Sequence, residues 1–185
     1  MSKKTSFQSL LYILVFIVGL ILPDFGFAKS AKEIDAGVDD SLEKFYQKIG
    51  EAEDLGKKAE GILVFPSVIK AGFGIGGEYG EGALRIKGKT VEYYSTAAAS
   101  FGFQLGVQSK TLILMFMSKK ALKNFRDSEG WEVGVDASVA LIAVGAGGSL
   151  DTTSLKKPIL GFVVDQKGLM YNLTLEGSKM TILKR

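Results

Sequence analysis

The pattern of apolar and polar positions changes twice along the 185 residues of the chain. An unbroken apolar run comes first, at 10–22. From Ile34 to Leu55, apolar residues recur at steps of three and four, which predicts a helix with one apolar stripe. From there on the pattern has the shorter period of strands. These changes divide the chain into three parts, residues 1–28, 29–60 and 61–185. We expect the second and third parts to form one globular unit.

The helical segment has a recognisable beginning and two predicted breaks. Ser30 and Glu33 have the spacing of a capping box, which opens a helix. Gly50 and Gly56 are expected to bend or end parts of it. The simplest interpretation is a helix packed on the core of the domain. The alternative is an amphipathic helix that moves onto a membrane, although its acidic polar face disfavours anionic lipid.

The third part predicts eight or more short strands joined by hairpin-type turns. The strands are expected at 62–65 (ended by Pro66), 84–87 and 90–94 (joined by a turn at Gly88 and Lys89), 111–117, 133–141, 159–164 (turned by 165–168), 169–175 and 180–183. One short helix, capped by Ser118, is expected at 119–126. The predicted fold is therefore mainly β (α+β). We expect a small antiparallel, glycine-rich β-barrel or closed sandwich with an N-terminal amphipathic helix and one short basic helix.

The composition removes most catalytic chemistry. The chain has no cysteine and no histidine, so it lacks thiolates, the commonest general base and the usual nucleophile systems. It has 23 glycines, well above the usual share of ~7% of residues, which indicates many turns and close backbone contacts. We therefore expect a protein that is not an enzyme and holds no cofactor or metal. An enzyme that uses carboxylates or tyrosine is the remaining catalytic alternative.

The N-terminal segment has the order of a secretory signal peptide. Two lysines precede the apolar run at 10–22, and Gly26 and Ala28 occupy the −3 and −1 positions of a cleavage site. Thirteen residues of helix span about 20 Å, short of a hydrocarbon core of about 30 Å. We expect cleavage to leave Lys29 as the first residue of a periplasmic or secreted protein that associates peripherally with membranes. An uncleaved anchor or a buried helix is the alternative.

Charge is unevenly distributed in the mature chain. Residues 29–60 carry 6 basic and 9 acidic residues, whereas residues 61–185 carry 15 and 10. The basic body permits contact with an anionic lipid surface, but its excess charge is too small to indicate nucleic-acid binding.

A glycine-rich stretch matches a nucleotide-binding pattern only superficially. Gly72, Gly74 and Gly77 satisfy GxGxxG, which holds a dinucleotide when a helix follows. Here Gly80 and Gly82 come next and the strand pattern resumes. We therefore predict a glycine-rich strand or loop where backbones approach closely. The later segment 93–106, which combines small residues with aromatics, is interpreted as core packing, with an apolar pocket as the alternative.

A basic helix is the clearest candidate binding site. Lys119, Lys123 and Arg126 lie at i, i+4 and i+7, which places them on one face of the predicted helix. The candidate lipid-binding residues are Lys119, Lys120, Lys123 and Arg126, with Lys70 as a fifth. Each contributes about 1 kcal/mol near an anionic surface. The alternative is an ordinary solvated helix face.

The segment KAEGILVFPSVIKAGFGIGG, at 58–77, resembles the opening of the SYLF domain, also described as the Ysc-type actin-regulator or lipid-binding domain. Further similarity lies at 100–108 and 121–125. At 158–162 and 167–170 the chain resembles the bacterial, exported branch of the family. The resemblance covers roughly residues 40–185. It differs from eukaryotic members at Tyr94-Ser95-Thr96, where those have a Trp-Ser-Pro-like element.

The resemblance implies lipid binding without catalysis. Eukaryotic relatives bind phosphoinositides and, in some cases, actin, which an exported protein does not meet in its own cell. We therefore expect a lipid- or membrane-binding module of the bacterial cell envelope, with anionic phospholipid among its ligands. The alternative is a structural or protein-interaction module of the periplasm that binds an envelope protein and no lipid. The oligomeric state is left open.

Overall fold

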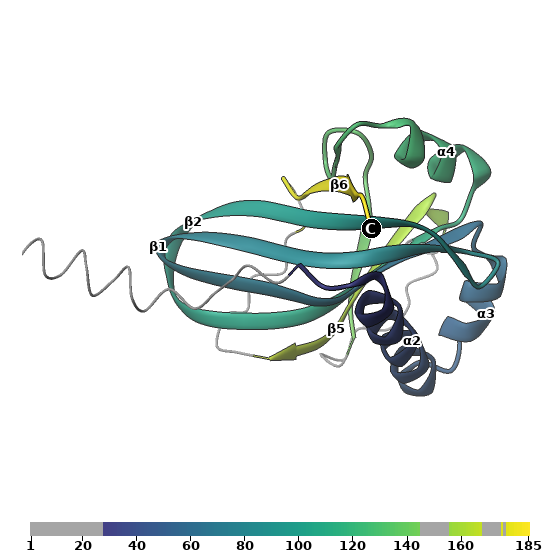
Figure 1. The fold of residues 1–185 in the computed structure, drawn as a ribbon, viewed down its shortest axis with the longest axis horizontal. Helices are drawn as coiled ribbons and strands as arrows, with labels where there is room; N and C mark the ends of the chain where they lie inside the picture. The colour runs from purple at the N-terminus through teal and green to yellow at the C-terminus, as the bar shows by residue number, and fades with distance from the viewer. Residues whose placement is uncertain (1–27, 145–155, 168–174, 176) are drawn as a thin grey trace, which may run out of the picture.

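The computed structural model of the chain describes residues 28–144, 156–167, 175 and 177–185. Its elements are α2 (Ala31–Lys48), α3 (Ala52–Lys58), β1 (Gly61–Ile86), β2 (Lys89–Phe116), α4 (Lys119–Asp127), β3 (Trp131–Glu132), β4 (Ala140–Ala143), β5 (Ile159–Lys167) and β6 (Lys179–Leu183) (Figure 1). The prediction of a mainly β fold is confirmed.

Helix α2 begins as its sequence predicts. The Glu33 backbone N–H donates to the Ser30 hydroxyl at 3.3 Å, and the Ser30 N–H donates to the Glu33 carboxylate at 2.7 Å. The helix ends at Lys48, and α3 follows after a short break that contains Gly50. Phe45 of α2 is fully buried and packs on Phe162 of β5, with ring centroids 4.9 Å apart. In this structure the helix therefore lies on the core.

Strands β1 and β2 form one long antiparallel ribbon that bends back on itself. They pair from Gly61 with Phe116 at one end to Ile86 with Lys89 at the other. The turn is one residue earlier than predicted, at Lys87 and Gly88, which both have positive φ. The bend lies at 72–77 of β1 and 100–106 of β2. We call the bend and the strand residues beside it, 69–79 of β1 and 97–110 of β2, the fold corner; it lies at the left of Figure 1, at the other end of the molecule from α3 and α4.

The bend divides the ribbon into two legs that face each other. The first leg pairs β1 residues 61–72 with β2 residues 106–116, and the second pairs 75–86 with 89–101. The backbones of the two legs touch at glycines. A Cβ added to Gly82 would lie 2.0 Å from the Val64 carbonyl oxygen, and one added to Gly80 would lie 3.0 Å from the Ser67 oxygen. At the bend itself, a Cβ on Gly72 would lie 2.5 Å from the Cα of Gly76. The predicted close approach of backbones is confirmed.

The remaining strands extend both legs into one curled sheet. The order is β3-β6-β2-β5-β4, with β1 paired to β2. Strand β5 pairs with β2 in the first leg, and β6 pairs with β2 in the second. The sheet forms a half-barrel rather than the predicted barrel or closed sandwich. It is also not wholly antiparallel, because β4 runs parallel to β5.

Three local predictions differ from the structure. Pro66 does not end a strand, because a register shift between Phe65 and Val68 lets β1 continue past it. The predicted strand at 133–141 is replaced by an isolated bridge between Val133 and Ala137, a turn containing Gly134 at positive φ, and the start of β4 at Ala140.

The last of these differences concerns the end of β5. This strand continues through the turn predicted at 165–168 as far as Lys167, with Asp165 at positive φ. The predicted strand at 169–175 lies outside the described residues except for Leu175.

The concave side of the half-barrel is apolar where α4 closes it. Helix α4 begins at the predicted cap, where the Ala121 N–H donates to the Ser118 hydroxyl at 3.2 Å. Phe125 of α4 packs on Tyr94, Phe116 and Trp131, with ring centroids 4.9, 4.8 and 5.4 Å away. Side chains therefore fill this end of the interior.

Candidate lipid-binding surfaces

The fold corner carries the reverse of the usual polarity on the two faces of its sheet. On the convex face, Ile69, Ile75 and Val107 are 46%, 69% and 67% exposed. On the concave face, Lys70 and Gln108 are only 6% and 3% exposed. Because neighbouring residues on a strand point to opposite faces, Lys70 lies directly behind Ile69 and Gln108 behind Val107. In water a sheet normally buries its apolar face and exposes its polar one.

The exposed convex surface of the corner has no charge. We call it the corner patch; its members are Ile69, Ala71, Ile75, Gly77, Tyr79, Ala97, Ala99 and Val107. The segment 69–79 contains two charged residues, Lys70 and Glu78, and both are buried. The segment 97–107 contains none. An uncharged, convex, apolar surface at one end of a molecule is typical of an interaction site.

The concave face of the corner holds a buried group that we call the inner polar cluster: Lys70, Glu78, Gln108 and Lys110. Lys110 Nζ lies 2.9 Å from Oε1 and 3.0 Å from Oε2 of Glu78, and it donates its hydrogen bond to Oε2. Oε1 is held by charge alone. The pair joins the two legs, since Lys110 belongs to the first leg and Glu78 to the second.

The other two members of the inner polar cluster, Lys70 and Gln108, have side-chain nitrogens without a partner among the described residues. Lys70 and Gln108 are direct cross-strand partners in the first leg. Among the described residues, no hydrogen bond or ion pair reaches the Lys70 ammonium. Nε2 of Gln108 is buried and has no hydrogen-bond partner there either. The cluster therefore holds one positive charge more than its own residues neutralise.

The five residues predicted to form one basic site do not lie together in the structure. Lys119 and Lys120 of α4 are exposed. Lys123 forms an ion pair with Asp127, and Arg126 Nε lies 3.1 Å from the Glu92 carboxylate. These four side chains share the surface of α4, where Lys119, Lys123 and Arg126 line a hollow of about 340 Å³. The fifth candidate, Lys70, does not join them, because it lies inside the fold corner.

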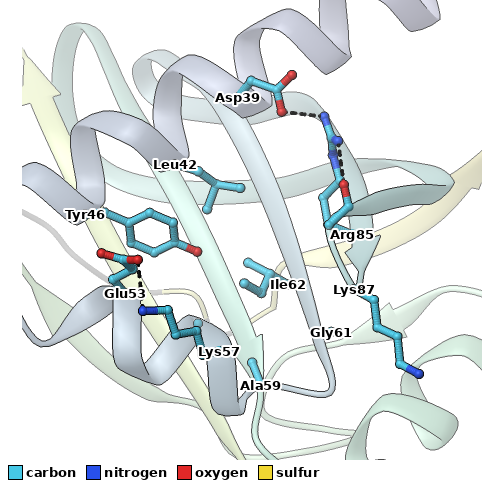
Figure 2. Close-up of a pocket in the computed structure, with 12 residues that line it drawn as sticks. Asp39, Leu42, Tyr46, Glu53, Lys57, Ala59, Gly61, Ile62, Arg85 and Lys87 are labelled. Atoms are coloured by element: carbon cyan, nitrogen blue, oxygen red, sulfur yellow. Dashed lines mark hydrogen bonds and ion pairs between the residues drawn. The ribbon is translucent and has the colours of Figure 1, made fainter.

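A groove that the sequence did not predict runs between α2, α3 and the β1–β2 turn. Its volume is about 490 Å³. Figure 2 shows Leu42, Tyr46 and Ile62 facing into it from α2 and β1. At the rim, Arg85 donates to Asp39 at 2.7 Å, and Lys57 lies 3.0 Å from Glu53 (Figure 2). Both pairs form within the molecule, whereas Lys70 has no ion pair among the described residues.

Comparison with known proteins assigns most of the sheet to a family. Residues 97–184 match the family model Ysc84, described as Las17-binding protein actin regulator. This match confirms the resemblance to the SYLF domain over residues 97–184. No curated protein matches the chain. The matched part of the SYLF domain contains Gln108, Lys110 and all of α4, whereas Lys70 and Glu78 precede it.

The sequence analysis singled out both halves of the fold corner but misjudged which of their residues are buried. The segment 93–106 was expected to pack in the core. Tyr94 and Thr96 do so, but Ala97 and Ala99 are exposed on the corner patch. The signal in the sequence is the alternation of apolar with charged or glycine positions in 69–79. That alternation predicts that the two faces of the strand differ in polarity, but it does not predict which face is exposed to water.

Proposed function

We propose that this chain is a non-catalytic lipid- or membrane-binding module of the bacterial cell envelope and that it contacts the membrane through the corner patch. This proposal rests on the reversed polarity of the fold corner, where apolar side chains are exposed and polar ones are buried. Transfer of a large aliphatic side chain from water to an apolar medium gains about 1.5–3 kcal/mol when it is complete. Ile69, Ile75 and Val107 are each about half to two-thirds exposed, so their insertion gains several kcal/mol together.

The shape and charge of the corner favour a bilayer over a protein partner. The patch carries no charge that would have to be desolvated. It occupies a convex end that no helix of the described chain covers (Figure 1), so it enters a flat interface without obstruction. Within the described residues, none of the helices has the length and apolar character needed to cross a membrane. The proposed contact is therefore peripheral.

Helix α4 is proposed as a weaker, auxiliary contact. Lys119 and Lys120 have no ion pair among the described residues, whereas Lys123 and Arg126 each face a carboxylate. Two free ammonium groups contribute about 2 kcal/mol near an anionic surface at low salt. This contribution is screened as the ionic strength rises.

Flotation with liposomes tests the proposal. Residues 29–185 are expected to float with vesicles, and the double variant Ile75→Ser, Val107→Ser is expected to lose most of this binding. Val135→Ser is the matched control, because Val135 is 74% exposed but lies outside the fold corner. Replacing the four basic residues of α4 by Gln should weaken binding to anionic vesicles at low salt only.

Two results would count against the proposal. Equal flotation of the double variant and the control would exclude the corner patch as the contact. A wild-type protein that floats with neither anionic nor neutral vesicles, but is recovered with one stoichiometric envelope protein and no lipid, would favour the protein-interaction module.

We also propose that the chain is exported and cleaved after Ala28. The buried Glu81 carboxylate accepts hydrogen bonds from the Lys29 backbone nitrogen at 3.0 Å, the Tyr79 hydroxyl at 2.9 Å and Arg185 at 2.8 Å. Cleavage would convert the Lys29 nitrogen into an ammonium group facing this carboxylate. A charged hydrogen bond is stronger than a neutral one, so the new terminus would tighten this contact.

The cleaved terminus is expected to stabilise the domain by about 1 kcal/mol. The comparison is between a protein that begins at Lys29 and one that carries a Gly-Ser extension before it, both measured by urea unfolding. Glu81→Gln in each background completes the cycle and should remove the difference. The proposed contact would be contradicted if the extension left the free energy of unfolding unchanged, or if it lowered that free energy by the same amount in the Glu81→Gln background.

A further inference from the structure

The inner polar cluster holds one positive charge more than the carboxylates of the described residues neutralise. Lys110 is neutralised by Glu78, with both side chains less than a tenth exposed. Lys70 is equally buried, and no carboxylate of the described residues pairs with it. The amide nitrogen of Gln108, its cross-strand partner, is also without an acceptor. Two donors of hydrogen bonds therefore lie side by side, and no side chain of the described residues accepts from either of them.

An arrangement of this kind is costly unless a ligand completes it. A buried ion without a partner destabilises a fold by several kcal/mol, and a buried unpaired amide adds about 1–3 kcal/mol. The other buried charged side chains of the described residues, Glu78, Glu81 and Lys110, each have an ion-pair partner. The exception at Lys70 thus points to an external anion.

We propose that Lys70, Gln108 and Lys110 form an oxyanion site that takes a phosphate group. The ammonium groups and the amide supply several donors, which match the several acceptor oxygens of a phosphate. Glu78 holds Lys110 in place and leaves the cluster with a net charge of one. That charge equals the single negative charge of a phosphodiester. The site would therefore take the phosphodiester of a phospholipid head group in preference to a doubly charged monoester.

The identity of the phosphate's source rests on the proposed membrane-binding function. Ile69 and Lys70 are neighbours on β1, and Val107 and Gln108 are neighbours on β2, so the corner patch and the oxyanion site lie on opposite faces of the same stretch of sheet. Contact of the convex face with a bilayer brings the concave face to the level of the head groups. A free phosphate is the other source of the same chemistry.

Inorganic phosphate is the first probe, at a pH low enough for its singly charged form to predominate. Thermal unfolding of residues 29–185 is followed as chloride is replaced by phosphate at constant ionic strength. A saturable rise in Tm is expected for the wild type, and Lys70→Met should reduce the apparent affinity at least about tenfold, the loss of one charge-assisted hydrogen bond. Lys120→Met is the matched control, since Lys120 is exposed on α4.

The variant itself provides a check on folding. Lys70→Met keeps the side-chain length and removes an uncompensated buried charge, so in chloride it should be at least as stable as the wild type. The proposal is overturned if the wild type gives no saturable response, if Lys70→Met responds as the wild type does, or if Lys120→Met loses the response equally.

Vesicles distinguish the two sources of phosphate. Flotation is compared between phosphatidylglycerol vesicles and vesicles of a neutral galactolipid, which has no phosphate. If the head group is the ligand, Lys70→Met should lose affinity for the first and keep it for the second. Saturable phosphate binding without flotation would support a site for free phosphate and reject the membrane function. Flotation that is equal on both vesicles and unchanged in Lys70→Met would reject the phosphate site and leave the membrane function standing.

Discussion

Replacing Lys110 by Met is expected to destabilise the domain by about 3–5 kcal/mol, because it removes one partner of a buried ion pair. The Lys110 and Glu78 side chains are 5% and 7% exposed, and the ammonium nitrogen lies 2.9 Å from the nearer carboxylate oxygen. Among the described residues, Glu78 has no other cation within ion-pair distance. Methionine fills a similar volume, so the loss reflects the unpaired carboxylate rather than a cavity.

Urea unfolding measures this effect, with the fluorescence of the single tryptophan as the signal. Trp131 is buried against Phe125, so it reports loss of the concave core. Lys123→Met is the control, because its pair with Asp127 is exposed and should contribute no more than about 1 kcal/mol. Adding Glu78→Gln to Lys110→Met should restore most of the lost stability. A single variant within about 1 kcal/mol of the wild type would show that the pair is open to water.

The ion pair matters for function because it crosses the fold corner. Lys110 and Glu78 belong to different legs of the ribbon, and between them the chain bends to present the corner patch. Loss of the pair should therefore loosen the corner before it unfolds the rest of the domain. Reduced flotation at urea concentrations that leave Trp131 fluorescence unchanged would be the sign of such a local effect.

Gly82→Ala is expected to cost about 3 kcal/mol, at the upper end of the usual range for added volume in a packed core. The new methyl group would lie 2.0 Å from the Val64 carbonyl oxygen and 2.7 Å from Cδ1 of Phe65. A backbone oxygen in a paired strand cannot rotate away as a flexible side chain does. The two legs would have to separate, which opens the concave core between them.

A second glycine in the same strand provides the comparison for Gly82→Ala. A Cβ on Gly77 would meet its nearest atom, the Ala98 oxygen, at 4.0 Å, which is ordinary contact. Gly77→Ala should change the free energy of unfolding by no more than about 0.5 kcal/mol. Both variants are measured by urea unfolding. If the two cost the same, close contact of the legs is not what requires glycine at position 82.

Features that depend on nearby residues could be predicted from the sequence. The capping box of Ser30 and Glu33, the Ser118 cap of α4 and the hairpin turn at Gly88 are set by interactions within a few residues, and the structure confirms the first two and moves the third by one position. The mainly β class and the SYLF resemblance rest on patterns spread over many residues, so an error at one position does not overturn them.

The strand boundaries and the position of Lys70 needed the tertiary structure. Proline is expected to end a strand because it cannot donate a backbone hydrogen bond. In the structure, β1 pairs with β2 on both sides of Pro66 and continues as one strand of 26 residues. Lys70 was grouped with the basic helix because both are cationic. The ribbon instead turns Lys70 inward beside Gln108, far along the chain from α4.

By itself, the sequence determined which residues alternate and where helices begin, because those properties depend on neighbours a few positions apart. Only the tertiary structure decided which face of the alternating corner is buried. Local sequence does not distinguish the two faces of such a strand. The face that becomes buried is the one against which another segment packs. Here the two legs pack face to face, which buries Lys70 and Gln108 of the first leg and leaves Ile69 and Val107 exposed on its other face. The corner patch and the inner polar cluster both follow from that packing.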